Sequence, residues 1–75
     1  MRIIIKDRSQ QCLVTLEVES WNTISHIKRR IEASNNIPQV KQRLLYYGMT
    51  LKDNLTLSDY NLKDDSVLHV LVIVK

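Results

Sequence analysis

Apolar residues recur along the chain with two different periods, one typical of a helix and the other of strands. Between residues 23 and 33 the isoleucines are three and four positions apart and charged residues occupy the opposite face, which predicts one amphipathic helix. Its apolar stripe consists of Ile24, Ile27 and Ile31. Thr23 can act as the N-cap, and Asn35-Asn36 can take the left-handed conformation that ends a helix before Pro38. We expect the rest of the chain to pack around this helix.

The other apolar runs alternate with polar residues, which is the period of β-strands. Residues 1–6 and 14–18 are expected to pair as a hairpin, and because the intervening turn lacks glycine, we expect a loose loop there. Further short strands are expected at 42–47, followed by a turn at Gly48, and from Leu51 onward. A tight turn is expected at 56–60. Trp21, between hairpin and helix, is expected to cover the end of the core.

The last apolar run, residues 66–74, has two apolar faces. One face would carry Leu68, Val70, Val72 and Val74, and the other Val67, His69, Leu71 and Ile73. Such a strand is either covered on both sides or leaves one face open to a partner. A second, smaller apolar patch is expected where Leu13 lies opposite Ile4 on the outward face of the hairpin.

Length and composition indicate one small intracellular domain. Seventy-five residues with 44% apolar content can bury about 60% of the unfolded chain's surface in a single core. Cys12 has no partner for an internal disulfide, and we find neither a membrane-spanning run nor a signal peptide pattern in the sequence, so we expect a cytosolic or nuclear protein. The net charge of +3 is mild, and we interpret Lys28-Arg29-Arg30 as a solvated helix face and not as a nucleic-acid site.

No combination of residues indicates catalysis. The sequence has no nucleophile and base pairing, no metal-ligand spacing and no phosphate-binding loop. The two histidines, His26 and His69, are expected on opposite sides of the sheet. We therefore expect no catalytic residue, no metal site and no cofactor.

Several short segments of the sequence occur in ubiquitin in the same order and at almost the same spacing. They are Leu16-Glu17-Val18-Glu19, Thr23-Ile24, Ile37-Pro38, Gln42-Arg43-Leu44, Gly48, Leu51, the run from Thr56 to Asn61, and Leu68-His69. The whole chain thus resembles a ubiquitin-like domain, with one extra residue in the first hairpin turn. The resemblance implies an α+β fold of the β-grasp type, with a mixed sheet of four to five strands packed on one helix. It also implies that the first and last strands run parallel at the centre of the sheet, and that Tyr60 tethers its loop to the backbone.

The resemblance also implies partner-binding residues. The residues that match or border ubiquitin's apolar recognition patch are Leu45, His69, Leu71, Arg8, Arg43, Gly48 and Met49. A secondary patch would consist of Ile37, Val72, Ile73, Val74, Ile4 and Leu13. Arg8 stands in or near the position of a leucine in ubiquitin, and Ile73 in that of an arginine used by the activating enzyme. Met49 and Asp64 stand where ubiquitin carries its principal linkage lysines.

These matches imply a non-catalytic docking domain. We expect residues 1–75 to be a monomeric, N-terminal module that brings a larger protein to ubiquitin-binding domains or helices, or to ubiquitin receptors of the proteasome. One alternative is a conjugated modifier, which requires Gly-Gly after Lys75, where the given sequence stops. Another is a scaffold or self-association domain that uses the apolar sheet face. Membrane binding is not expected.

Overall fold

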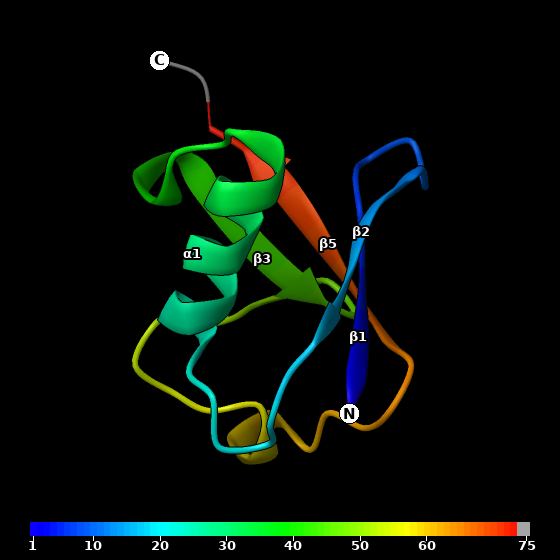
Figure 1. The fold of residues 1–75 in the computed structure, drawn as a ribbon, viewed down its shortest axis with the longest axis vertical. Coiled ribbons are helices and arrows are strands. Elements are labelled where there is room, and N and C mark those ends of the chain that lie inside the picture. The colour runs from blue at the N-terminus through cyan, green and yellow to red at the C-terminus, as the bar shows by residue number, and fades with distance from the viewer. Residues whose placement is uncertain (74–75) are drawn as a thin grey trace.

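A five-stranded mixed sheet forms the scaffold of the molecule (Figure 1). The computed structural model describes residues 1–73. The strands are β1 (Arg2–Lys6), β2 (Cys12–Glu17), β3 (Gln42–Tyr46), β4 (Met49–Thr50) and β5 (Ser66–Val72), in the spatial order β2-β1-β5-β3-β4. β5 runs parallel to β1 and antiparallel to β3. The α+β fold of the β-grasp type is therefore confirmed, with the last strand of the chain at the centre of the sheet.

The helix α1 (Ile24–Asn35) packs across one face of this sheet. The hydroxyl of Thr23 accepts a hydrogen bond from the backbone N–H of His26 at 3.2 Å, as expected of an N-cap. Asn36 takes the left-handed conformation, with φ of 58°, and its N–H donates to the carbonyl of Glu32. The predicted end of the helix at Asn35-Asn36 is therefore confirmed.

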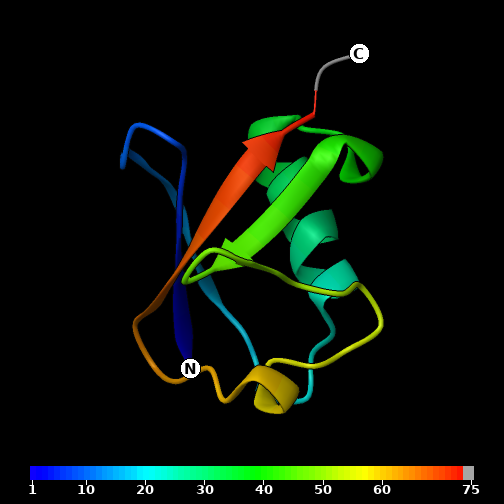
Figure 2. The ribbon, with the colours of Figure 1, turned by 180° about the vertical axis from the view of Figure 1, so that it is seen from behind.

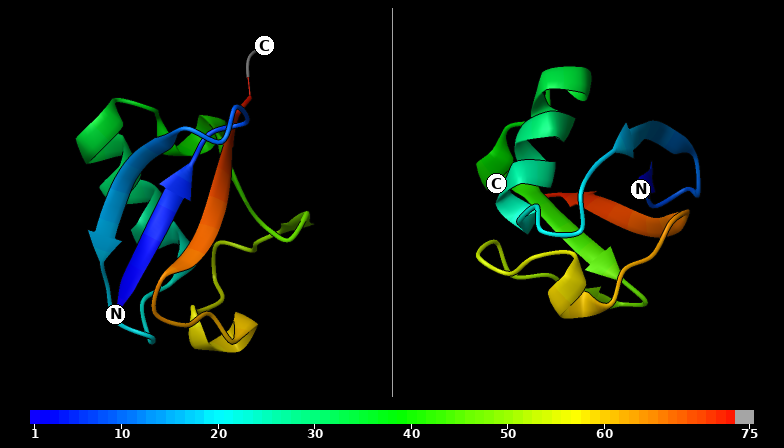
Figure 3. Two further views of the ribbon diagram at one scale, coloured as in Figure 1. Left: turned by 90° about the vertical axis from the view of Figure 1, so that its right-hand side faces the viewer. Right: turned by 60° about the horizontal axis from the view of Figure 1, so that its bottom comes forward.

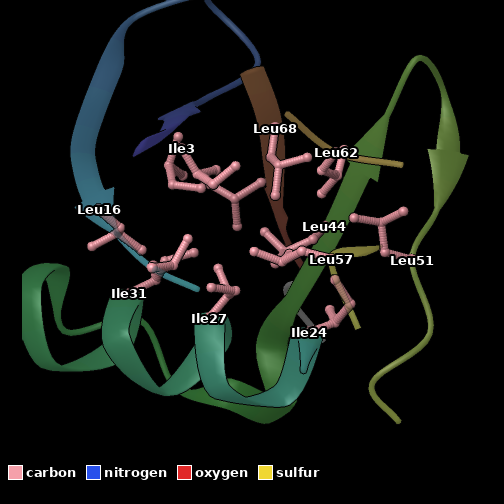
Figure 4. Close-up of a cluster of buried hydrophobic side chains, with 13 residues drawn as sticks. Ile3, Leu16, Ile24, Ile27, Ile31, Leu44, Leu51, Leu57, Leu62 and Leu68 are labelled. Atoms are coloured by element: carbon pink, nitrogen blue, oxygen red, sulfur yellow. The ribbon is translucent and has the colours of Figure 1, made fainter. Parts of the chain in front are cut away.

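The core lies between α1 and the sheet, where the helical isoleucines meet apolar side chains from the strands and the long connection between β4 and β5 (Figure 4). Thirteen apolar residues are buried there: Ile3, Ile5, Leu16, Val18, Ile24, Ile27, Ile31, Leu44, Leu51, Leu57, Leu62, Leu68 and Val70. The predicted helical stripe is thus confirmed as part of the core.

A β-bulge interrupts the pairing of β1 with β2. Ile5 lies opposite Val14, but Lys6 lies opposite Cys12, so Leu13 is the extra residue and packs against the core. A bulge reverses the alternation of side chains along its strand. The predicted contact of Leu13 with Ile4 is therefore wrong, because Ile4 lies opposite Thr15.

The β3–β4 hairpin turns through Tyr47 and Gly48, which both have positive φ, at 51° and 78°. Two such residues are the mark of a type I′ turn, so the predicted turn at Gly48 is confirmed. The prediction that the next strand begins at Leu51 is wrong. β4 ends at Thr50, and Leu51 turns into the core while its N–H donates to the carbonyl of Leu44.

Two short 3₁₀ helices, η1 (Gln39–Lys41) and η2 (Ser58–Tyr60), complete the described part of the chain. Thr56 and Asp59 exchange two hydrogen bonds around η2, so the predicted tight turn is confirmed. The hydroxyl of Tyr60 accepts a hydrogen bond from the backbone N–H of Lys52 at 2.8 Å, which is the expected tether. Within residues 1–73, no helix is both long and apolar enough to cross a membrane.

Two side chains are not where the sequence predicts them. Trp21 is 68% exposed and does not cover the core. Leu57, whose N–H donates to the carbonyl of Asn22 next to Trp21, is fully buried instead. Lys28 is buried instead of solvated, and its ammonium group lies 2.6 Å from the carboxylate of Asp53. The basic triplet is therefore not one solvated face.

Candidate partner-binding surface

The face of the sheet opposite α1 has no covering layer among residues 1–73. Seen from behind, β5 and β3 lie in front of the helix (Figure 2), and β2, β1 and β5 present the same open face in Figure 3. This arrangement explains the two apolar faces of β5. Leu68 and Val70 are buried on the helix side, whereas Val67, His69 and Leu71 are half-buried on the open side.

The strand register brings the predicted recognition residues together on this open face. Leu45 on β3 lies opposite His69 on β5, and Arg43 lies opposite Leu71. One shallow hollow is lined by Arg8, Gln10, Leu45, Gly48, His69 and Leu71. We call this hollow the docking hollow.

Arg43 and Met49 border the docking hollow without lining it. Arg43 lines the neighbouring hollow with Val40, Lys41 and Ile73. Met49 is half-exposed on β4 and pairs with Tyr46 on the far side of the type I′ turn. Both residues are thus at the edge of the surface that the sequence predicts.

The loop between β1 and β2 brings Arg8 and Gln10 to the docking hollow. One carboxylate oxygen of Asp7 accepts hydrogen bonds from the Ser9 N–H, the Ser9 hydroxyl and the Gln11 N–H, at 2.6 to 3.0 Å. These bonds, with that from the Ser9 hydroxyl first, lower the pKa of Asp7. The loop is therefore organised around one charged side chain.

Gln10 joins this loop to the sheet and was missed by the sequence analysis. Its Oε1 accepts a hydrogen bond from Nε2 of His69 at 2.9 Å, and its φ is 71°. The one feature of the sequence that could have indicated the position of Gln10 was the extra residue in the first hairpin turn.

A second hollow adjoins the docking hollow and was also missed. Its lining is Tyr46, Tyr47, Gly48, Asp64, Asp65, Ser66, Val67 and His69. The rings of Tyr46 and Tyr47 lie 4.6 Å apart between their centroids, at 60° to one another. The features of the sequence that could have indicated this hollow were two consecutive tyrosines before Gly48 and two consecutive aspartates before the last strand.

The described residues of the predicted secondary patch do not form one surface. Ile37 packs partly against the core, while Ile4 lies between Thr15 and Val67 on the open face. Val72 lines a separate hollow with Asp7, Arg8, Ser9 and Val70. Ile73 lies beside Arg43, as described above, and Val74 is outside the described residues. Leu13, in the bulge, packs against the core.

The chemistry of the described residues fits contact with a partner. Residues 1–73 contain no group of three or more His, Cys, Asp or Glu side chains that could hold a metal ion. The docking hollow offers apolar side chains, one imidazole and one guanidinium group. Such a surface can bury an apolar segment and form hydrogen bonds at its rim.

Comparisons with known proteins identify the family. The model of the ubiquitin family matches residues 3–75. The chain is 40% identical over all its 75 residues to NEDD8-like protein RUB3 of Arabidopsis thaliana, and the match covers 95% of that protein. It is also similar to two proteins of which it spans less than a fifth. The first is Protein DNA-DAMAGE INDUCIBLE 1 of the same plant, with 35% identity over 72 residues, which are 96% of this chain and 17% of that protein. The second is Ubiquitin domain-containing protein DSK2 of Saccharomyces cerevisiae, with 34% identity over 70 residues, which are 93% of this chain and 19% of that protein. Since the family model spans nearly the whole sequence and the observed fold is the one implied, this chain belongs to the ubiquitin family.

Proposed function

We propose that this chain is a non-catalytic docking domain that binds an apolar helix of a ubiquitin receptor through Leu45, His69 and Leu71. One observation carries the proposal: these three side chains line a single hollow on the sheet face that α1 leaves uncovered. Half-buried apolar side chains gathered on an open face are typical of a protein-binding surface. A helix laid into a shallow apolar groove is a common mode of recognition.

The size of the surface agrees with moderate affinity. Burying one leucine side chain contributes about 1.5–3 kcal/mol, and association costs several kcal/mol before any affinity appears. Leu45 and Leu71, with smaller contributions from His69 and the edge residue Met49, can therefore support binding in the micromolar range.

Two of the relatives support a role inside a larger protein. The matched segment is less than a fifth of Protein DNA-DAMAGE INDUCIBLE 1 and of DSK2, so similar domains are parts of longer chains there. In the proposed role the domain recruits its host to ubiquitin receptors, including those of the proteasome. The cytosol and the nucleus are the compartments that this role requires.

An NMR titration tests the proposal. A ¹⁵N-labelled domain is titrated with a ubiquitin-interacting helical peptide, and we expect shift changes centred on Leu45, His69 and Leu71. The substitution Leu45→Ala should weaken binding about tenfold, because it removes roughly 1.4 kcal/mol or more of apolar burial. Leu71→Glu should weaken it further, because it places a charge in the hollow.

Trp21→Ala is the matched control, because it removes a large exposed side chain from the loop between β2 and α1. We expect it to leave the affinity unchanged. The proposal fails if no shifts occur at millimolar peptide, or if Leu45→Ala binds as tightly as the parent domain while both are folded.

A conjugated modifier is the second candidate function. The observation that favours it is the 95% coverage of NEDD8-like protein RUB3, which shows that a relative of nearly this length exists. The parent open reading frame decides whether Gly-Gly follows Lys75. If it does, ATP-dependent thioester formation with a ubiquitin-like activating enzyme would support this second function.

A further inference from the structure

The open face carries opposite charges at the two ends of the β5–β3 pair. At one end, Arg43 lies opposite Leu71 and Arg8 lines the docking hollow. At the other end, Asp64 and Asp65 line the second hollow beside Tyr47. The two hollows share His69 and Gly48, so they form one continuous surface.

The negative end has one carboxylate available to a partner. Asp65 accepts a hydrogen bond from Nε of Arg2 at 2.7 Å, and this contact lowers the pKa of Asp65 and raises that of Arg2. Asp64 instead accepts a hydrogen bond from the backbone N–H of Arg2 at 2.6 Å and forms no ion pair within residues 1–73. Within this part of the chain Asp64 therefore has no direct ion pair, and its charge acts on Arg2 only at a distance, where it adds to the larger effect of Asp65 in raising the pKa of Arg2.

The tyrosine pair strengthens the preference for a positive group at this end. Tyr47 is 91% exposed, and its ring stands against that of Tyr46. Aromatic faces attract the positively charged side chains of lysine and arginine. A basic side chain in the second hollow would thus meet a carboxylate and aromatic rings together.

We propose that the segment bound on this face carries an Arg or Lys at the end that lies over Asp64 and the tyrosine pair, and an acidic residue at the end over Arg8 and Arg43. This inference rests on the proposed function and specifies the partner of the same surface. Opposite charges at the two ends fix the direction in which the helix lies, which is how complementary charges supply specificity.

The strand geometry sets the spacing of these charges. From Ser66 to Leu71 the chain advances five residues in a strand, or roughly 17 Å. A helix rises about 1.5 Å per residue, so a similar distance takes about eleven residues, or three turns. The acidic and basic side chains of the partner should therefore be about eleven residues apart.

A pair of peptides and a pair of domain variants test the inference. Both peptides are amphipathic helices with the same apolar face and glutamates at one end. The first carries arginine about eleven residues later, and the second carries glutamine there. The variant Asp64→Asn removes the charge but keeps an oxygen acceptor for the N–H of Arg2. Glu32→Gln removes the same charge from the exposed side of α1 and serves as the control.

We expect Asp64→Asn to weaken binding of the arginine peptide about threefold, the size of an exposed ion pair, and to leave the glutamine peptide unchanged. Glu32→Gln should change neither. A paramagnetic label at the arginine end of the peptide should broaden the amide signals of Tyr47 and Ser66 more strongly than that of Arg43.

The outcomes separate this inference from the proposed function. If both peptides bind with shifts that depend on Leu45, but Asp64→Asn affects them equally or not at all, the charge order is wrong and the docking function stands. Stronger broadening at Arg43 than at Ser66 would also overturn the charge order. If neither peptide binds through Leu45, both the inference and the proposed function fail.

Discussion

Asp7 is the residue on which the conformation of the β1–β2 loop depends. Its three hydrogen bonds to Ser9 and Gln11 hold a loop that contains no glycine, and Gln10 in that loop reaches His69 in the docking hollow. A change at Asp7 should therefore be detected at the proposed binding surface as well as in the loop.

The pKa of Asp7 predicts an acid-sensitive loop. Since hydrogen bonds lower its pKa in the folded protein, the ionised form is stabilised at pH above the unfolded value of about 3.9, and this contribution is lost as pH falls through the lower folded value. We expect the protection of the Ser9 and Gln11 amides, which is their exchange rate compared with that of an unstructured chain at the same pH, to fall in that acid range, as measured by NMR.

Asp7→Asn is the control for this prediction, because an amide oxygen accepts hydrogen bonds but is not protonated in this range. The protection of its loop amides should show no titration step below pH 5. If the parent protein also lacks such a step, the carboxylate of Asp7 does not organise the loop.

At the scale of the elements, the buried side chain of Gln42 joins α1, the segment after it and β3. Its Nε2 donates to the carbonyl of Lys28 at 2.9 Å and to that of Ile37 at 2.8 Å. Gln42→Leu keeps a side chain of similar size but leaves both carbonyls without this donor. We expect a loss of about 2–3 kcal/mol in the free energy of unfolding, measured with urea.

An exposed glutamine provides the comparison for Gln42. Gln11→Leu should change the free energy of unfolding by less than about 0.5 kcal/mol, as is usual for surface positions. An equally small effect of Gln42→Leu would show that water replaces its hydrogen bonds without cost.

The elements that could be predicted from the sequence are those set by local signals. Thr23, Asn36 and Gly48 act on their own neighbours, so the helix ends and the hairpin turn follow from residue type. The burial of Lys28 could not be predicted in this way, because it depends on Asp53, which lies 25 positions away. The bulge at Leu13 depends likewise on the register of the partner strand.

For the whole molecule, the small core makes stability sensitive to single substitutions. A domain of 75 residues has a free energy of unfolding of about 4–11 kcal/mol. Ile27 is fully buried, and Ile27→Ala should cost about 2–5 kcal/mol. The midpoint of urea unfolding should fall steeply with little change in its slope.

Val40→Ala is the matched control for Ile27, since Val40 is an 88% exposed apolar residue. It should leave the midpoint within experimental error. A comparable loss in both variants would mean that the burial of Ile27 does not determine the stability of the domain.

The site could be predicted only in part at this scale. The resemblance predicts that Leu45, His69 and Leu71 lie together, because a similar fold implies a similar strand register. Gln10 and Asp64 reach the same face through a loop and a turn with positive φ at Gln10 and Asp65. Their placement depends on backbone conformations that residue type alone does not specify.

The central position of β5 has a consequence for how the protein is made on the ribosome. β1 pairs with β2 and β3 with β4 through nearby residues, but β1 and β3 are joined only through β5. Until residues 66–72 are synthesised and leave the exit tunnel, the emerging chain holds two separate strand pairs, and the apolar side of each is incompletely covered. Closing the sheet must bring Ile3 beside Ser66, a slow step that pairs distant parts of the chain. We therefore expect a nascent chain stalled before β5 to be sensitive to proteases and to bind chaperones, and one stalled after it has emerged to be resistant.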